Sequence, residues 1–213
     1  MNDSRTLLAD GLWHKNPALI QLIGICPLLA VTSTLVNGLA LGLATIVVLV
    51  GTNLVVSLLR HALIPSVRIL IFVMIISSLV TTIDILTNAF FYELHEVLGL
   101  FIPLIITNCA ILAQAETIAS RNKLGKSMIS GLGSGLGFTI VLVLLGGMRE
   151  IIGLGSLFSG IEMLLGDSAL KLTINLPYEG ALIAILPPGA FFGLAALIAL
   201  RNLLVSKVKV KRI

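Results

Sequence analysis

The sequence predicts an all-α protein that crosses a membrane several times. Of its 213 residues, 57% are hydrophobic and 11% are charged, and the mean hydropathy is +1.11. A soluble domain carries roughly 25% charged residues, so this chain has too little charge to cover a surface that faces water. The same hydrophobicity excludes a disordered chain. A membrane β-barrel would alternate polar and apolar residues along each strand, whereas this sequence has long apolar runs.

The length of the apolar runs predicts six membrane spans, because a helix needs roughly 20 apolar residues to cross the hydrocarbon core. The charge-free run 16–59 is too long for one helix and divides near residues 32–38, where polar residues and glycine indicate a turn. The expected spans are 17–34, 38–59, 69–91, 97–118, 128–148 and 181–203. We expect residues 151–179 to form a loop, and residues 1–213 to form a single membrane domain.

The basic residues are distributed unevenly between the two ends of these spans, and this sets the predicted orientation. Six spans put both termini, the loop after the second span and the loop after the fourth span on one side. That side holds Arg5, Lys15, Arg60, Arg68, Arg121, Lys123, Lys126, Arg201, Lys207, Lys209, Lys211 and Arg212, and the other holds Arg149 and Lys171. Both termini are therefore predicted to be cytoplasmic. Membrane topology also accounts for the pI of 9.3, so we expect the lipid bilayer, and no nucleic acid, as a partner.

A weak internal repeat divides the chain into two halves. Segment 26–34 matches segment 109–117 at Cys, Leu, Ala and Thr, and segment 38–43 resembles segment 131–136 through its Gly-Leu pairs, with about ten extra residues in the later half. The repeats would cover about 17–91 and 97–203. Each holds three spans, and because three is odd, the second repeat is expected to be inverted relative to the first. Inverted repeats place functional sites near the membrane midplane, where the halves meet.

The two cysteines are expected at that depth. Cys26 lies about 14 Å into the first span and Cys109 about 18 Å into the fourth, at a rise of 1.5 Å per residue, in a core about 30 Å thick. Gly24, Pro27 and Pro103 lie near them, and proline removes a backbone donor. We therefore expect spans 1 and 4 to be broken near the midplane.

These cysteines have three possible interpretations. In the first, they are small buried hydrophobic residues. In the second, they form a disulfide, which a reducing cytoplasm disfavours. In the third, they are metal ligands. Their matched repeat positions and depth favour ligation by Cys26 and Cys109. Thiolates select iron–sulfur clusters, zinc or copper(I), and a cluster normally takes four cysteines. The histidines, His14, His61 and His95, all lie at predicted membrane edges. For a cluster, the remaining two thiolates would therefore have to come from a partner, either a second copy of this chain or a homologous sister subunit.

Four segments of the chain carry a resemblance to a known family. They are Asn16–Thr34, with Cys26 and Pro27 at its centre, Ile102–Cys109, Arg149–Gly153 and Leu186–Phe192. These segments resemble the E-type subunits of Rnf ion-translocating oxidoreductases, and a similar D-type subunit occurs in the NADH:quinone sodium pump. The resemblance covers nearly the whole chain. It implies a complex, in the bacterial inner membrane, that couples electron transfer between ferredoxin and NAD to Na⁺ or H⁺ translocation.

The resemblance also implies a cofactor and partners. A homologous A-type subunit, inserted in the opposite sense, would share a [2Fe–2S] cluster with this chain, whose ligands map onto Cys26 and Cys109. Flavins and further iron–sulfur clusters would lie in partner subunits of the B, C, D and G types. This chain would then be one subunit of the oxidoreductase. The chain itself would bind no NADH and would contain no catalytic residue. Relatives often read Gly-Arg-Ala-Glu where this chain has Ala113-Gln114-Ala115-Glu116, so Gln114 replaces an arginine.

Several polar residues in or beside the spans have two interpretations each. Asp84 and Glu116 either mark ion passage or are edge residues that face water or pair with a base. Asn108 either donates to a cluster sulfur or caps a half-helix. Arg149 and Glu150 are interpreted as a local structural pair. The alternative function is a secondary transporter with a midplane site, which would require polar substrate ligands beside the helix breaks.

Overall fold

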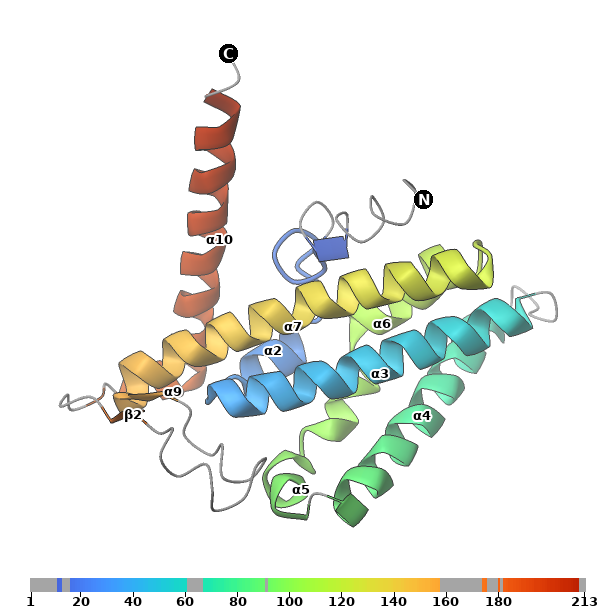
Figure 1. Cartoon of the computed structure of the whole chain (residues 1–213), viewed down its shortest axis with the longest axis horizontal. Coiled ribbons are helices and arrows are strands. Elements are labelled where there is room, and N and C mark those ends of the chain that lie inside the picture. The colour runs from blue at the N-terminus through green and yellow to red at the C-terminus, as the bar shows by residue number, and fades with distance from the viewer. Residues whose placement is uncertain are drawn as a thin grey trace.

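The computed structural model describes residues 11–12, 16–60, 67–90, 92–157, 174–175, 180 and 182–210, which form a bundle of helices (Figure 1). The first half of the chain contributes α2 (Ile25–Val31), α3 (Leu35–Leu59), α4 (Arg68–Phe90) and α5 (Tyr92–Leu98). The second half contributes η3 (Ile102–Ile105), α6 (Cys109–Gln114), the π-helix η4 (Ala115–Ala119), α7 (Leu124–Leu154), α9 (Leu182–Ile185) and α10 (Pro187–Val210). Two strands, β1 (Ser156–Leu157) and β2 (Ile174–Asn175), pair antiparallel.

The prediction of a multi-span helical membrane protein is confirmed, with one correction to the spans. Five segments of the described chain are long and apolar enough to cross a membrane: Leu35–Leu59, Arg68–Phe90, Ile102–Ala119, Leu124–Leu154 and Pro187–Val205. The predicted first span, residues 17–34, is not a single helix. Its first part forms turns, and only Ile25–Val31 is helical. The β1–β2 pair is a small departure from an all-α fold.

The backbone before α2 explains why the first span does not continue as one helix. Leu22 and Gly24 have positive φ values, of 54° and 81°, and a left-handed residue ends a right-handed helix. Gly24 then begins α2 without a side-chain cap. Pro27 lies in the first turn of α2, where its missing N–H has no helical partner to lose. The break that the sequence predicts beside Cys26 is therefore present.

The fourth predicted span is broken as well. Its first part is η3, a single 3₁₀ turn with Pro103 at its start, and the chain leaves the helical conformation before Cys109 opens α6. The helix then widens into η4, and the turn 120–123 leads to α7. This stretch holds the extra residues that the later half has relative to the first.

The last span contains a break that was not predicted from the sequence. Helix α9 ends at Ile185, and α10 begins at Pro187 after one non-helical residue, Leu186. The consecutive prolines at 187 and 188 explain the interruption, because proline disfavours a helical conformation in the residue before it. Of the loop predicted at 151–179, residues 151–154 belong to α7, and 158–173 and 176–179 lie outside the described residues.

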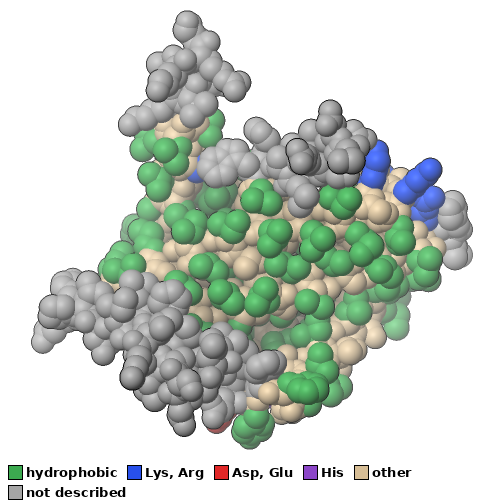
Figure 2. Space-filling view, in the orientation of Figure 1, with side chains coloured by type: hydrophobic (Ala, Val, Ile, Leu, Met, Phe, Trp, Pro, Cys, Tyr) green, Lys and Arg blue, Asp and Glu red, His purple; other side chains and the backbone are tan. Residues whose placement is uncertain are grey.

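Helices α3 and α7 form the centre of the bundle, and α4 and α10 lie on its periphery (Figure 1). The most apolar stretch of α7 is 61% buried, against 17% for the corresponding stretches of α4 and α10. Figure 2 shows hydrophobic side chains spread over the visible faces of the bundle, with Lys and Arg gathered at one end, where α7 begins. The exposed basic residues of that end are Arg121, Lys123 and Lys126. This surface is typical of a protein surrounded by lipid.

Helices α3 and α7 run antiparallel, and their contacts are reciprocal. A Cβ at Gly38 would meet Leu142, and a Cβ at Gly131 would meet Leu49. Likewise Gly42 faces Thr139, and Gly135 faces Ile46. In each of these pairs of contacts, the α3 residue and the α7 residue that takes its place in the other contact are 93 positions apart in the sequence.

The apolar clusters also contain contacts between the two halves of the chain. Leu28 of α2 packs with α7 and α10, whereas η3 and α6 pack with α3 and α4, in a cluster that Val31 of α2 also joins. Each short helical segment thus contacts long helices of the other half. The arrangement links the two halves through their interrupted segments.

Candidate functional site

The two cysteines occupy corresponding places in the two broken segments. Cys26 is the second residue of α2, and Cys109 is the first residue of α6. Both side chains are exposed and neither forms a disulfide. The Cys109 thiol lies 3.8 Å from the carbonyl oxygen of Thr107, the acceptor of its hydrogen bond. Neither thiol is buried within the isolated chain, in contrast to the interpretation of the cysteines as small buried hydrophobic residues.

The two helix breaks meet. A Cβ placed on Gly24 would lie 2.8 Å from the side-chain oxygen of Asn108 and 3.4 Å from Cβ of Ala110. Gly24 precedes Cys26 by two residues, and Asn108 directly precedes Cys109. The fold thus brings together two segments that are more than 80 residues apart in the sequence. Since Gly24 tolerates both the close approach and the positive φ, a glycine is required at this point.

The meeting point lies against the middle of the longest helix. A Cβ at Gly24 would lie 3.2 Å from the ring of Phe138, and Phe138 is central in α7, which runs from Leu124 to Leu154. Phe138 and Leu28 belong to the same buried cluster. The two breaks are therefore far from both ends of α7.

Asn108 caps α6. Its side-chain oxygen accepts a hydrogen bond of 3.0 Å from the backbone N–H of Ala110, which satisfies one of the free donors at a helix start. The residue is 1% exposed, and its side-chain nitrogen has no hydrogen-bond partner among the described residues. The capping interpretation is confirmed, and the side-chain NH₂ remains available as a donor beside Cys109.

The two acidic residues singled out in the sequence each lie beside a base. Arg68, at the start of α4, donates a hydrogen bond of 2.5 Å to Glu116 in η4. Asp84 in α4 lies 3.4 Å from Nδ1 of His95 in α5. Neither residue lies at the meeting point of the breaks, and each links two neighbouring elements.

Gln114 lines a mostly apolar cavity of about 390 Å³ beside the breaks. Its side-chain nitrogen donates to Oγ of Ser130 at 3.0 Å, and Oγ of Ser134 donates to its side-chain oxygen at 3.4 Å. The other polar residues of the lining are Gln21, Thr45 and Thr117. Ile23 and Ala110, next to the breaks, also belong to the lining, so the cavity runs from the meeting point along α7.

Comparison with known proteins identifies the family. The model of the Rnf-Nqr subunits, described as membrane proteins, matches residues 4–198. The chain belongs to the Rnf-Nqr family. It is 55% identical over 206 residues to the E-type subunit of the ion-translocating oxidoreductase complex of Pseudoalteromonas atlantica. The matched residues cover 96% of this chain and 89% of the relative. It is 50% identical to the corresponding subunit of Vibrio parahaemolyticus, over 100% of this chain and 93% of the relative. The resemblance to the E-type subunits is confirmed.

The thiols of this Rnf-Nqr chain fit a cluster that is shared with a partner. Within the described residues, no group of three or more Cys, His, Asp and Glu side chains is close enough to hold a metal ion. Two exposed thiols beside the meeting breaks would make up half of the four ligands that an iron–sulfur cluster normally takes. The side-chain NH₂ of Asn108 is a donor of the kind that hydrogen-bonds to cluster sulfurs and tunes their potential.

Two polar residues that hold this region of the fold were not predicted from the sequence, and Asn16 is the first. It is 3% exposed. Its oxygen accepts from the N–H groups of Ala18 and Leu19, and its nitrogen donates to the carbonyl oxygens of Leu12 and Gly137. The sequence does contain a signal for this role of Asn16, because it is a polar residue that begins a charge-free run and directly precedes Pro17.

Arg149 is the second, because its contacts reach well beyond the local pair with Glu150 that the sequence suggested. The guanidinium hydrogen-bonds with residues of α9 and of the end of α2, whereas Oε2 of Glu150 accepts from the N–H of Leu35 at 2.8 Å. The two side chains thus hold different ends of the turn between α2 and α3.

Some residues named in the sequence lie outside the described residues. They are Arg5, His14, Lys15, His61, Lys171, Lys211 and Arg212, together with the side chains of Lys207 and Lys209.

Proposed function

We propose that this chain is the E-type subunit of a bacterial complex that couples electron transfer between ferredoxin and NAD to Na⁺ or H⁺ translocation. In this complex Cys26 and Cys109 supply two of the four thiolates of an intramembrane [2Fe–2S] cluster. A homologous A-type subunit supplies the other two. Flavins, further clusters and the NADH site belong to partner subunits of the B, C, D and G types.

One observation carries this proposal: two exposed thiols that form no disulfide lie at two helix breaks that meet against the middle of α7. If α7 spans the bilayer, its middle lies near the midplane. A cluster there would divide the path of an electron across the membrane into shorter steps.

The proposed topology is an inverted repeat. Residues 17–91 and 97–203 form the two halves, each with three crossings, and the interrupted 17–34 segment is the first crossing. The reciprocal contacts of α3 and α7 support this arrangement. Both termini are cytoplasmic, and the complex lies in the inner membrane.

The proposal is tested on the intact complex, purified with all its subunits. Iron content and the EPR spectrum of the reduced complex are recorded for the wild type, Cys26→Ala and Cys109→Ala. We expect each substitution to remove the signal of the intramembrane cluster and two iron atoms per complex. Ser78→Ala, an exposed position on α4, is the control and retains both. Survival of the signal in both cysteine variants contradicts the proposal.

The cavity of about 390 Å³ favours the alternative function of secondary transport, since several polar side chains, among them Gln114 and Ser130, lie in its mostly apolar lining beside the helix breaks. The same variants separate the two functions. A transporter keeps its ion flux when both cysteines are alanine, and it has no iron to lose. In the oxidoreductase, electron transfer and ion uptake into proteoliposomes are lost together.

A further inference from the structure

Arg149 has an unusual environment near the end of α7. The residue is 4% exposed, and each of its five N–H groups has an oxygen acceptor. Nε donates to the carbonyl oxygen of Ala184 at 3.0 Å, and Nη2 donates to those of Ile185 and Leu186. Nη1 donates to the carbonyl oxygen of Leu29 at 3.3 Å and to Oγ1 of Thr32 at 2.8 Å.

These acceptors belong to two segments that are far apart in the sequence. Leu29 and Thr32 are at the end of α2, and residues 184–186 are the end of α9 and the break before α10. Carbonyl groups at a helix end lack partners within the helix, and a planar guanidinium with five donors in a fixed geometry can serve several of them at once. Arg149 therefore joins the half-helix that carries Cys26 to the interrupted last span.

The other half of the chain has no such anchor at the corresponding positions. The offset of 93 between α3 and α7 pairs Arg149 with Val56, and the offset of 83 between the two cysteine segments pairs Leu29 with Leu112. Arg149 has no arginine counterpart at the repeat-related position.

We propose that Arg149 is a positioning residue for Cys26. Leu29 lies one helical turn after Cys26, so anchoring the end of α2 fixes where this thiolate lies. The buried positive charge behind α2 also favours the more negative, reduced form of a cluster held by Cys26. The inference rests on the proposed function, because it takes Cys26 as a cluster ligand.

The test measures the midpoint potential and the EPR line shape of the intramembrane cluster in the intact complex. Arg149→Met removes the charge and all five hydrogen bonds, so we expect a lower midpoint potential, a changed line shape and a several-fold loss of cluster occupancy. Arg149→Lys keeps the charge but not the planar fork, so the line shape changes while the potential falls less than with methionine. Ser57→Ala, which removes a hydrogen bond to the carbonyl oxygen of Asn122 in the turn before α7, is the control and leaves both quantities as in the wild type.

A complex with Arg149→Met that retains the wild-type potential and line shape overturns the inference. If this variant does not assemble, Thr32→Val gives the answer, because it removes one acceptor and keeps the side-chain shape. We then expect a smaller change of line shape, and an unchanged spectrum in Thr32→Val and Arg149→Lys overturns the inference. Cys26→Ala tests the proposed function separately. If Cys26→Ala loses the EPR signal of the cluster while the Arg149 variants keep the wild-type spectrum and potential, the proposed function stands and only the role of Arg149 is contradicted.

Discussion

Gly24 is the residue on which the meeting of the two breaks depends. Its φ of 81° and its approach to Asn108 and Phe138 both exclude a larger side chain. The sequence indicates that the helix is irregular here, because Gly24 precedes Pro27. It does not indicate which segment approaches the glycine, since that segment is more than 80 residues away.

We expect Gly24→Ala to destabilise the protein by at least about 1–2 kcal/mol, the cost of a left-handed conformation for a residue with a Cβ. The contact with Asn108 adds to this cost. Gly125→Ala is the control, because it lies in a helix and a Cβ there meets nothing within 4 Å. Thermal denaturation of the solubilised protein measures the difference. Equal midpoints for the two variants contradict the structure at Gly24.

At the scale of the elements, the close packing of α3 on α7 joins the two halves. Gly42 and Gly135 occupy repeat-related positions, and each faces a β-branched side chain on the other helix, Thr139 and Ile46 respectively. Small residues at such positions allow membrane helices to approach closely. The Gly-Leu segments that reveal the repeat in the sequence are therefore the segments through which the helices pack.

A size exchange tests this packing. A Cβ at Gly42 would lie 2.4 Å from Cγ2 of Thr139, so we expect Gly42→Ala to destabilise by about 1–3 kcal/mol, as overpacking does. Adding Thr139→Gly removes the clashing side chain and recovers part of the loss. A double-mutant cycle on thermal stability measures the coupling. Additive effects of the two substitutions show that the residues do not touch.

The breaks themselves were predicted unequally well. Those beside Cys26 and Cys109 follow from glycine, proline and repeated cysteine segments, which are local signals. The break between α9 and α10 has a local signal too, Pro187-Pro188, but its consequence is not local. It exposes carbonyl oxygens that Arg149 satisfies from another helix.

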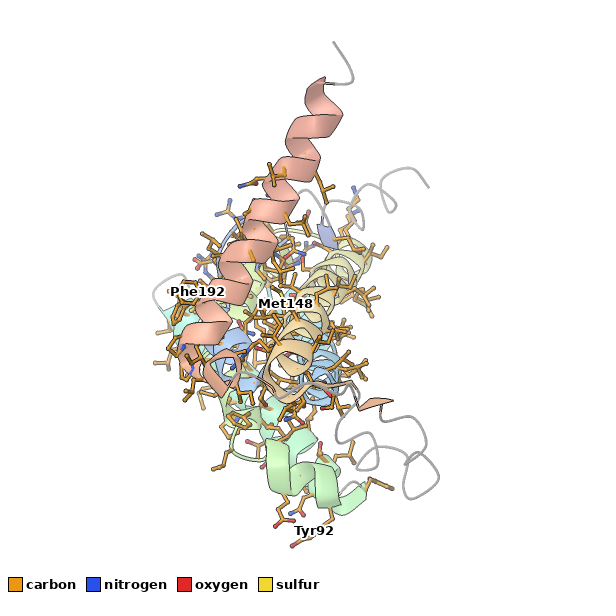
Figure 3. All side chains as sticks on the ribbon, turned by 90° about the vertical axis from the view of Figure 1, so that its left-hand side faces the viewer. Tyr92, Met148 and Phe192 are labelled. Atoms are coloured by element: carbon orange, nitrogen blue, oxygen red, sulfur yellow. The ribbon has the colours of Figure 1, made fainter. Side chains whose placement is uncertain are left out.

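At the scale of the whole molecule, the scarcity of charge determines the environment of the protein. Exposed hydrophobic side chains occur on all the long helices, and Figure 3 shows Met148 of α7 and Phe192 of α10 on one side of the bundle, with Tyr92 of α5 at its far end. Met148 and Phe192 line one apolar groove between α7 and α10. Lipid or neighbouring subunits cover such surfaces in a membrane complex.

The predicted orientation is tested with fusion proteins. Twelve basic residues on one side and two on the other predict a cytoplasmic C-terminus, so green fluorescent protein fused after Ile213 is expected to fluoresce, and alkaline phosphatase fused there to be inactive. Alkaline phosphatase inserted after Leu157, in the predicted outer loop, is the matched control and is expected to be active. The reverse activities contradict the orientation.

The sequence alone determined the class of the fold, most of the long helices, the family and the two cysteines. These follow from composition, apolar length and local motifs, which act within about 20 residues. Only the tertiary structure decided that the breaks meet against α7, that both thiols are exposed, and that Arg149 joins α2 to the last span. These are contacts between residues that lie 35 to 120 positions apart, and a periodicity that reports which face of a helix is apolar does not specify the partner of that face.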